Sequence, residues 1–199
     1  GERVGTVALN HYRHLELYFA PPCSGRSLHM CNMRLPNEHF VHTVEDAEDR
    51  VMFVDPAFVE KVEANAAELD TVEQYVVLAD EVPETSLEPV VSYEELISGQ
   101  PTEYDWPALD EEEECGLCHT SGTTGLPKGV AYTHRGMYLH TIMASHADAN
   151  GIGQHDVVAV VDQEFETLGL GLAAKLGGKP AENVPHFAVA DVGHNGACL

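Results

Sequence analysis

The segment 120–130 reads TSGTTGLPKGV and combines the groups that proteins use to hold a chain of phosphates. Its glycines let the backbone come close to an anion and reach positive φ. Successive backbone N–H groups in such a turn form a concave anion site. The hydroxyl groups donate to phosphate oxygens, and a lysine adds a mobile positive charge. We therefore predict a phosphate-binding loop formed by Thr120, Ser121, Gly122, Thr123, Thr124, Gly125 and Lys128.

The order of these residues separates the segment from the Walker A loop, which reads G-x-x-x-x-G-K-[ST]. Here the spacing is Gly122-x-x-Gly125-x-x-Lys128, and no serine or threonine follows the lysine. A surface turn that is rich in Ser, Thr and Gly and binds nothing is the simpler alternative. The ordered run of hydroxyls, glycines, proline and lysine is more restrictive than a pair of glycines, and it favours phosphate binding.

Short apolar runs that alternate with helical patterns must position this loop. The apolar runs predict buried strands, and apolar residues three or four apart, such as Val59 and Val62, predict helical faces. Asp55-Pro56 and the spacing from Ser92 to Glu95 are typical of helix starts. The alternation predicts a three-layer, doubly wound α/β fold with a largely parallel sheet. The predicted strands are 4–9, 28–31, 51–54, 75–78, 115–119 and 157–161, and the predicted helices are 14–19, 37–46, 56–67, 92–98 and 134–146.

The loop resembles the phosphate loop of the adenylate-forming (AMP-binding) enzymes: acyl-CoA synthetases, luciferases and peptide-synthetase adenylation domains. Three upstream segments are similar to the medium- and long-chain fatty-acyl-CoA synthetase (ligase) subgroup. They are NHYRHLELYFA at 10–20, LHMCNMRL at 28–35 and HTVEDAEDRV at 42–51. The resemblance covers residues 1–161 and implies part of the N-terminal domain of such an enzyme.

This resemblance implies a chemistry for the parent enzyme. ATP and a carboxylic acid give an acyl-adenylate and pyrophosphate, and CoA then gives acyl-CoA and AMP. The loop would hold the β- and γ-phosphates, and Mg²⁺ would bridge phosphate oxygens. The family's adenine pocket, acidic magnesium ligand, ribose-binding aspartate and C-terminal catalytic lysine follow the loop, and none is matched here. We therefore interpret the chain as a fragment without catalytic residues of its own; a non-catalytic phosphate- or nucleotide-binding α/β module is the alternative.

The tail departs from the resemblance. After the strand at 157–161 the family carries a Pro-x-Phe-His segment that lines the acyl and adenylate pocket, whereas this chain reads DQEFET at 162–167. We therefore divide the chain into a partial N-terminal domain, 1–161, and a divergent tail, 162–199, which could form a helix over 168–176 or be poorly ordered. Upstream of the loop, the proline-punctuated stretch 80–114 predicts a surface connection that carries no site.

The composition excludes several function classes. With 33 acidic and 10 basic residues the net charge is −23, which excludes a general nucleic-acid surface because phosphate contacts need basic patches. No apolar run reaches transmembrane length, and five cysteines without a signal-peptide pattern favour a reducing cytoplasm. Only four of the basic residues are lysines. This composition predicts a halophilic surface, and an ordinary acidic cytosolic protein is the alternative.

Residues 115–119, CGLCH, match the C-x-x-C-H pattern of c-type haem attachment. A small haem electron carrier is therefore a remote alternative function, as is a redox or zinc role for the two cysteines. Haem attachment usually accompanies export, for which no signal is visible, and zinc would need two further ligands. Because the pattern falls on a predicted strand, we interpret Cys115 and Cys118 as small, buried strand residues.

The charge generates a first testable prediction. We expect the chain to need molar salt to remain compact, because a net charge of −23 repels itself unless it is screened. Far-UV circular dichroism across a KCl series should show secondary structure increasing with salt. Equal folding at low and high salt would contradict the halophilic interpretation.

Overall fold

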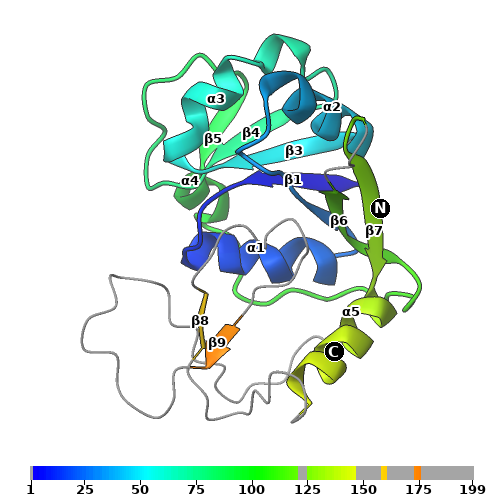
Figure 1. Cartoon of the computed structure of the whole chain (residues 1–199). Coiled ribbons are helices and arrows are strands. Elements are labelled where there is room, and N and C mark those ends of the chain that lie inside the picture. Colours follow the sequence, from blue (N-terminus) through cyan, green and yellow to red (C-terminus); the bar gives the residue numbers. More distant parts are fainter. Residues whose placement is uncertain (1, 121–124, 147–157, 161–172, 176–199) are drawn as a thin grey trace.

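The computed structural model describes residues 2–120, 125–146, 158–160 and 173–175. Its centre is a seven-stranded sheet with helices over both faces (Figure 1). The strand order is β5-β4-β3-β1-β2-β6-β7; β7 is antiparallel to β6, and the other neighbouring pairs are parallel. The strands are β1 (Arg3–Val7), β2 (Ser27–Met30), β3 (Asp49–Val54), β4 (Gln74–Val77), β5 (Val90–Ser92), β6 (Glu114–Thr120) and β7 (Lys128–Thr133).

Side chains cap the starts of several of the helical segments. Asp55 accepts a hydrogen bond from the backbone N–H of Ala57, and Ser92 accepts one from Glu95, as the sequence predicts. Thr133 caps the helix that follows β7 in the same way. The helices are α1 (Tyr12–Cys23), α2 (Asn37–Ala47), α3 (Val59–Glu63), α4 (Tyr93–Ile97) and α5 (His134–Ser145), with 3-10 turns η1 (Pro56–Phe58) and η2 (Ala66–Glu68).

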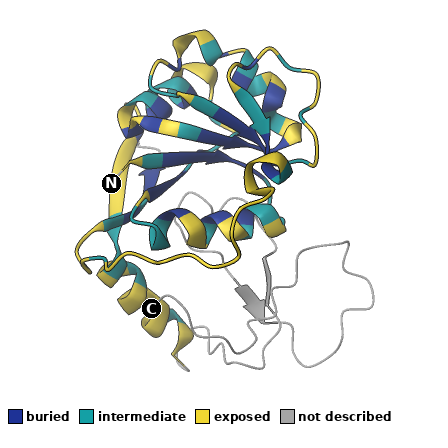
Figure 2. Cartoon of the chain, turned by 180° about the vertical axis from the view of Figure 1, so that it is seen from behind, coloured by how far each residue is buried: buried dark blue, intermediate teal, exposed yellow. Residues whose placement is uncertain are grey.

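The core consists of two apolar layers, one on each face of the sheet. Alternate residues of β3 enter different layers: Met52 packs with α2 and α3, whereas Phe53 packs with α1 and α4. Phe40 of α2 and Leu17 of α1 fill the two layers from the helix side. The buried residues accordingly follow the strands through the middle of the molecule (Figure 2). The predicted three-layer, doubly wound α/β fold is confirmed.

Several local predictions need correction. The helix predicted over 56–67 is divided into η1, α3 and η2. The stretch 80–114, predicted as a connection, contains β5, which extends the sheet by pairing with β4. The strand predicted at 157–161 is present as β8 (Val158–Val160), which pairs with β9 (Ala173–Lys175) in a separate two-stranded sheet. The helical alternative for 168–176 is therefore wrong over 173–175, because those backbone groups pair with β8.

None of the helices in the described part of the chain is long and apolar enough to cross a membrane.

Gly5 allows a buried carboxylate to lie against the central strand. A Cβ atom at Gly5 would lie 2.6 Å from Asp49 Oδ2, which is closer than such atoms can pack. Asp49 is fully buried at the start of β3, so its side chain has little room to move. Gly116 in β6 is different, because the nearest atom to a Cβ there would be the Leu28 carbonyl oxygen at 3.7 Å.

We therefore expect Gly5→Ala to lower the free energy of unfolding by about 1–3 kcal/mol, the usual cost of overpacking a buried site. Gly116→Ala is the matched control, because it adds the same methyl group to a strand without a clash. It should be neutral or slightly stabilising. Urea unfolding followed by circular dichroism measures both variants, and equal midpoints for the two would contradict this account of Gly5.

Candidate phosphate-binding site

The predicted phosphate loop connects two antiparallel strands (Figure 1). Thr120 is the last residue of β6 and Lys128 is the first residue of β7, and the two are direct partners across the hairpin. Thr120 Oγ1 donates a hydrogen bond to the Lys128 carbonyl oxygen at 3.4 Å. The structure thus brings the first and last predicted site residues together. Residues 121–124, which carry the predicted Ser121, Gly122, Thr123 and Thr124, lie outside the described residues.

The described end of the loop has the backbone and charge that anion binding needs. Gly125 has φ of +151°, a conformation that residues with a side chain rarely adopt. Pro127 is buried and fixes the chain where it enters β7, whereas Lys128 is exposed. An exposed ammonium group on a flexible stem can approach an anion without losing its hydration beforehand.

A hydrogen-bonded chain of four side chains lies next to the start of the loop. His119 Nε2 lies 3.0 Å from Asp46 Oδ2 of α2, and His119 Nδ1 lies 3.0 Å from His29 Nε2 of β2. His29 Nδ1 in turn lies 2.6 Å from Asp49 Oδ2 of β3. We call this set the Asp–His–His–Asp chain. It joins four elements of the fold, and one of its two inner members, His119, directly precedes Thr120.

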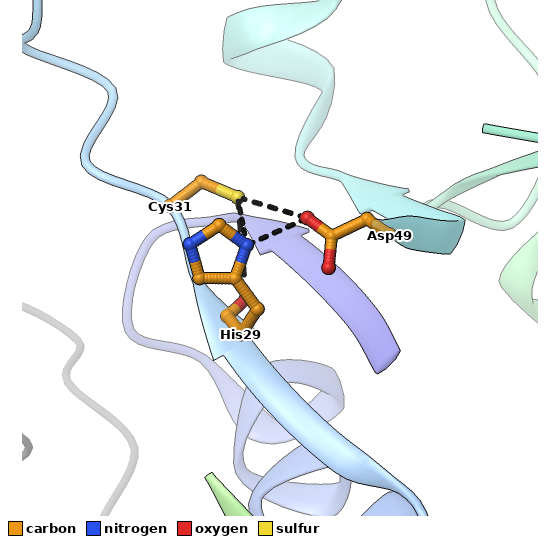
Figure 3. Close-up of side chains that lie close together, drawn as sticks. All are labelled: His29, Cys31 and Asp49. Carbon is orange, nitrogen blue, oxygen red and sulfur yellow. Dashed lines mark hydrogen bonds and ion pairs between the residues drawn. The ribbon is translucent and has the colours of Figure 1, made fainter. Parts of the chain in front are cut away.

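The inner end of this chain contains side chains of metal-binding type, His29, Cys31 and Asp49 (Figure 3). Two ligands of one zinc ion would lie about 3.4 Å apart, given zinc–ligand distances of about 2.1 Å and tetrahedral geometry. The separation of 2.6 Å between His29 Nδ1 and Asp49 Oδ2 is instead that of a charge-assisted hydrogen bond. Burial raises the pKa of the Cys31 thiol, which therefore stays protonated at neutral pH.

The surroundings shift the pKa values of the two histidines in opposite directions. Burial by itself opposes a charge on His29, but the adjoining Cys31 sulfur and Asp49 carboxylate together outweigh it, and the pKa of His29 lies well above its ordinary value. Burial lowers the pKa of His119, and its hydrogen bond to the half-exposed Asp46 only partly offsets that effect. The pair therefore accepts one extra proton readily and resists a second.

The CGLCH pattern lies inside the sheet. Cys115 and Cys118 are buried in β6, as the sequence predicts for small strand residues. His119 has both ring nitrogens engaged, one with His29 and one with Asp46, so neither is available to bind haem iron. A haem joined to both cysteines would have to enter the interior of the sheet. The structure therefore disfavours the haem alternative.

Comparison with known proteins shows to which family the chain belongs. The family described as AMP-binding enzyme matches residues 1–170. The chain belongs to this family. It is 42% identical to the long-chain-fatty-acid–CoA ligase of Thermus thermophilus over 165 residues, which cover 83% of this chain and 29% of that relative. It is 34% identical over 183 residues to the medium-chain-fatty-acid–CoA ligase of Ectopseudomonas oleovorans, covering 89% of this chain and 34% of that relative.

Solved structures agree with this membership. The anthranilate CoA ligase AuaEII, solved with anthranoyl-AMP, superimposes with a TM-score of 0.70 at 28% identity. The superposition covers 78% of this chain and 29% of that one. The chain therefore spans about a third of the length of the AMP-binding enzymes that it matches.

Sequence reasoning missed the residues that surround the loop. It assigned no role to His29, His42 or Asp46, and it considered His119 only as part of the haem pattern. A signal was nevertheless present, because His42 and Asp46 are four residues apart on one predicted helix and so share a face. The pairing of His29 with Asp49 and His119 had no sequence signal, since it depends on the order of strands in the sheet.

We expect Lys128→Ala to weaken pyrophosphate binding by about tenfold or more, because hydrogen bonds to charged groups contribute about 1.5–3 kcal/mol. Isothermal titration calorimetry with inorganic pyrophosphate measures the effect. His140→Ala is the control, because His140 is exposed on α5 and outside the loop. Unchanged binding in Lys128→Ala would remove the assigned role of the lysine.

Proposed function

We propose that this chain supplies the phosphate-binding part of an ATP-dependent fatty-acid–CoA ligase (AMP-forming). The observation that carries the proposal is the β6–β7 hairpin, which brings Thr120 and Lys128 together within a chain that belongs to the AMP-binding enzymes. The similarity to the long- and medium-chain ligases supports a fatty acid as the carboxylic acid that is activated.

The proposed role of the loop lies in the first half-reaction. The substrate carboxylate attacks the α-phosphate of ATP, and pyrophosphate leaves. The hydroxyl, amide and ammonium groups of residues 120–128 bind the β- and γ-phosphates and stabilise the charge that collects on the leaving group. CoA then attacks the acyl-adenylate in a second step, for which we assign no residue of this chain.

Mg²⁺ is proposed for the parent enzyme, because hard cations bind phosphate oxygens. Of the described loop residues, Thr120 offers a hydroxyl and Lys128 an ammonium, and neither is a carboxylate. The described loop therefore suits the phosphates themselves, and we expect an acidic ligand for the metal from another part of the enzyme.

A second candidate is a non-catalytic α/β module that binds phosphate or nucleotide. It rests on the same hairpin, because anion binding by residues 120–128 would need no catalytic residue. The remaining assignments are also proposals: a boundary between the partial domain 1–161 and the tail 162–199, a place in lipid metabolism, a cytoplasmic location and a halophilic surface.

We expect these 199 residues alone to release no pyrophosphate in response to fatty acid and ATP. Positioning effects can contribute about 7–11 kcal/mol to catalysis, and one loop supplies only a small part of that positioning. A coupled pyrophosphate assay with medium- and long-chain fatty acids is the measurement, and a Thermus-type ligase of full length is the positive control. Robust fatty-acid-dependent release by this chain would overturn the expectation.

A further inference from the structure

Helix α2 contacts the phosphate loop at both of its ends. Asp46 Oδ2 accepts a hydrogen bond from His119 Nε2 just before the loop begins, at 3.0 Å. His42 Nε2 lies 3.1 Å from the Pro127 carbonyl oxygen just before the loop ends, so this ring nitrogen carries the proton. Because His42 and Asp46 are four residues apart on α2, one helical face makes both contacts.

The close approach of α2 to β7 depends on Gly129, the residue after Lys128. A Cβ atom there would lie 3.3 Å from His119 Nε2 and 3.5 Å from Asp46 Oδ2. The glycine therefore leaves room for the hydrogen bond between these two side chains. This arrangement is specific to the β6–β7 hairpin, because Gly129 and His119 are partners across it.

The number of protons in the Asp–His–His–Asp chain determines whether the Asp46–His119 contact and its neighbouring hydrogen bonds can form together. Three hydrogen bonds link Asp49, His29, His119 and Asp46, and each needs one proton on a ring nitrogen because ionised carboxylates only accept. Two neutral imidazoles carry two such protons. All three hydrogen bonds therefore form together only when the histidine pair holds one extra proton and a single positive charge.

We propose that His42, Asp46 and His119 are positioning residues for the phosphate loop, and that the proton shared by His29 and His119 holds the Asp46–His119 contact in place by tying His119 to β2. This inference rests on the proposed function of the loop as the anion site. We call the two hydrogen bonds between α2 and the loop ends, His42–Pro127 and Asp46–His119, the clasp.

The charges around the shared proton set the direction of its pH dependence. Asp46 faces it from α2, Asp49 from β3 and the neutral Cys31 from the end of β2, while the Arg3 guanidinium of β1 is paired mainly with Glu114. The raised pKa of His29 means that the proton is held below that pKa and lost as the pH rises through it. The hydrogen bond between His29 and His119 is then lost, because each neutral imidazole keeps the proton that faces its carboxylate. His119 is no longer held from the side of β2, and the clasp weakens at alkaline pH.

The first experiment tests the contact at the end of the loop. His42→Leu removes the donor to the Pro127 carbonyl, whereas His42→Gln keeps an N–H donor at the same place. We expect His42→Leu to weaken pyrophosphate binding roughly three- to tenfold, the equivalent of one hydrogen bond, and His42→Gln to restore most of it. Hydrogen exchange of the 120–130 peptide should be faster in His42→Leu than in His42→Gln, with or without pyrophosphate.

The second experiment tests the shared proton. Asp46→Asn keeps the shape of the side chain but can donate to His119 Nε2, so that two neutral imidazoles satisfy all three hydrogen bonds. Pyrophosphate dissociation constants are measured for wild type and variant from about pH 6 to pH 9.5. Because pyrophosphate itself titrates, the readout is the ratio of the two constants at each pH. We expect similar affinities at low pH and roughly threefold weaker wild-type binding at high pH.

The outcomes separate this inference from the proposed function. A pyrophosphate affinity that Lys128→Ala does not change counts against the anion site, whereas the exchange rates of the 120–130 peptide still test the clasp. Equal exchange rates in His42→Leu and His42→Gln would overturn the role of His42. A wild-type to Asp46→Asn ratio that is constant with pH would overturn the shared proton. Circular dichroism of the four proteins confirms that each is folded.

Discussion

The buried carboxylate of Asp49 is the constraint on which the surroundings of the loop depend. An ionised group in the interior of a protein is strongly unfavourable unless it is paired and hydrogen-bonded. Asp49 is hydrogen-bonded to His29, His29 to His119, and His119 to the half-exposed Asp46. The order β3-β1-β2-β6 brings these side chains together across the sheet, and the absence of a side chain at Gly5 leaves room for the Asp49 carboxylate.

The proposed anion site would have to attract phosphate within a strongly acidic chain. The net charge of −23 repels phosphate over most of the surface, so binding must be local. Backbone N–H groups and hydroxyls provide that local attraction without a basic patch, and Lys128 adds one positive charge. The antiparallel strand β7 runs back beside β6 after the loop. Its pairing with β6 therefore keeps the two ends of the loop next to each other.

The family membership and the local geometry address different questions. Membership in the AMP-binding enzymes identifies the chemistry that relatives with these elements carry out on carboxylic acids. The geometry shows how the described residues are arranged: a hairpin that pairs Thr120 with Lys128, and a helix, α2, that contacts residues at both ends of the loop. The shared proton adds a property that neither the motif nor the family description contains, because it arises from three hydrogen bonds that must form at once.

The sequence by itself determined the α/β class and most of the strands and helices, and it is the source of the proposal that residues 120–128 bind phosphate. Periodicity and capping residues act over a few positions, so Asp55, Ser92 and Thr133 could be assigned as helix caps without the fold. Tertiary structure decided which short segments became strands: β5 follows Pro89 in a stretch that reads as a loop, and it forms because β4 offers an unpaired edge. It also decided the Asp–His–His–Asp chain. Its members His29 and His119 are 90 residues apart in sequence and meet only because β2 and β6 are neighbours, a relation that no local pattern encodes.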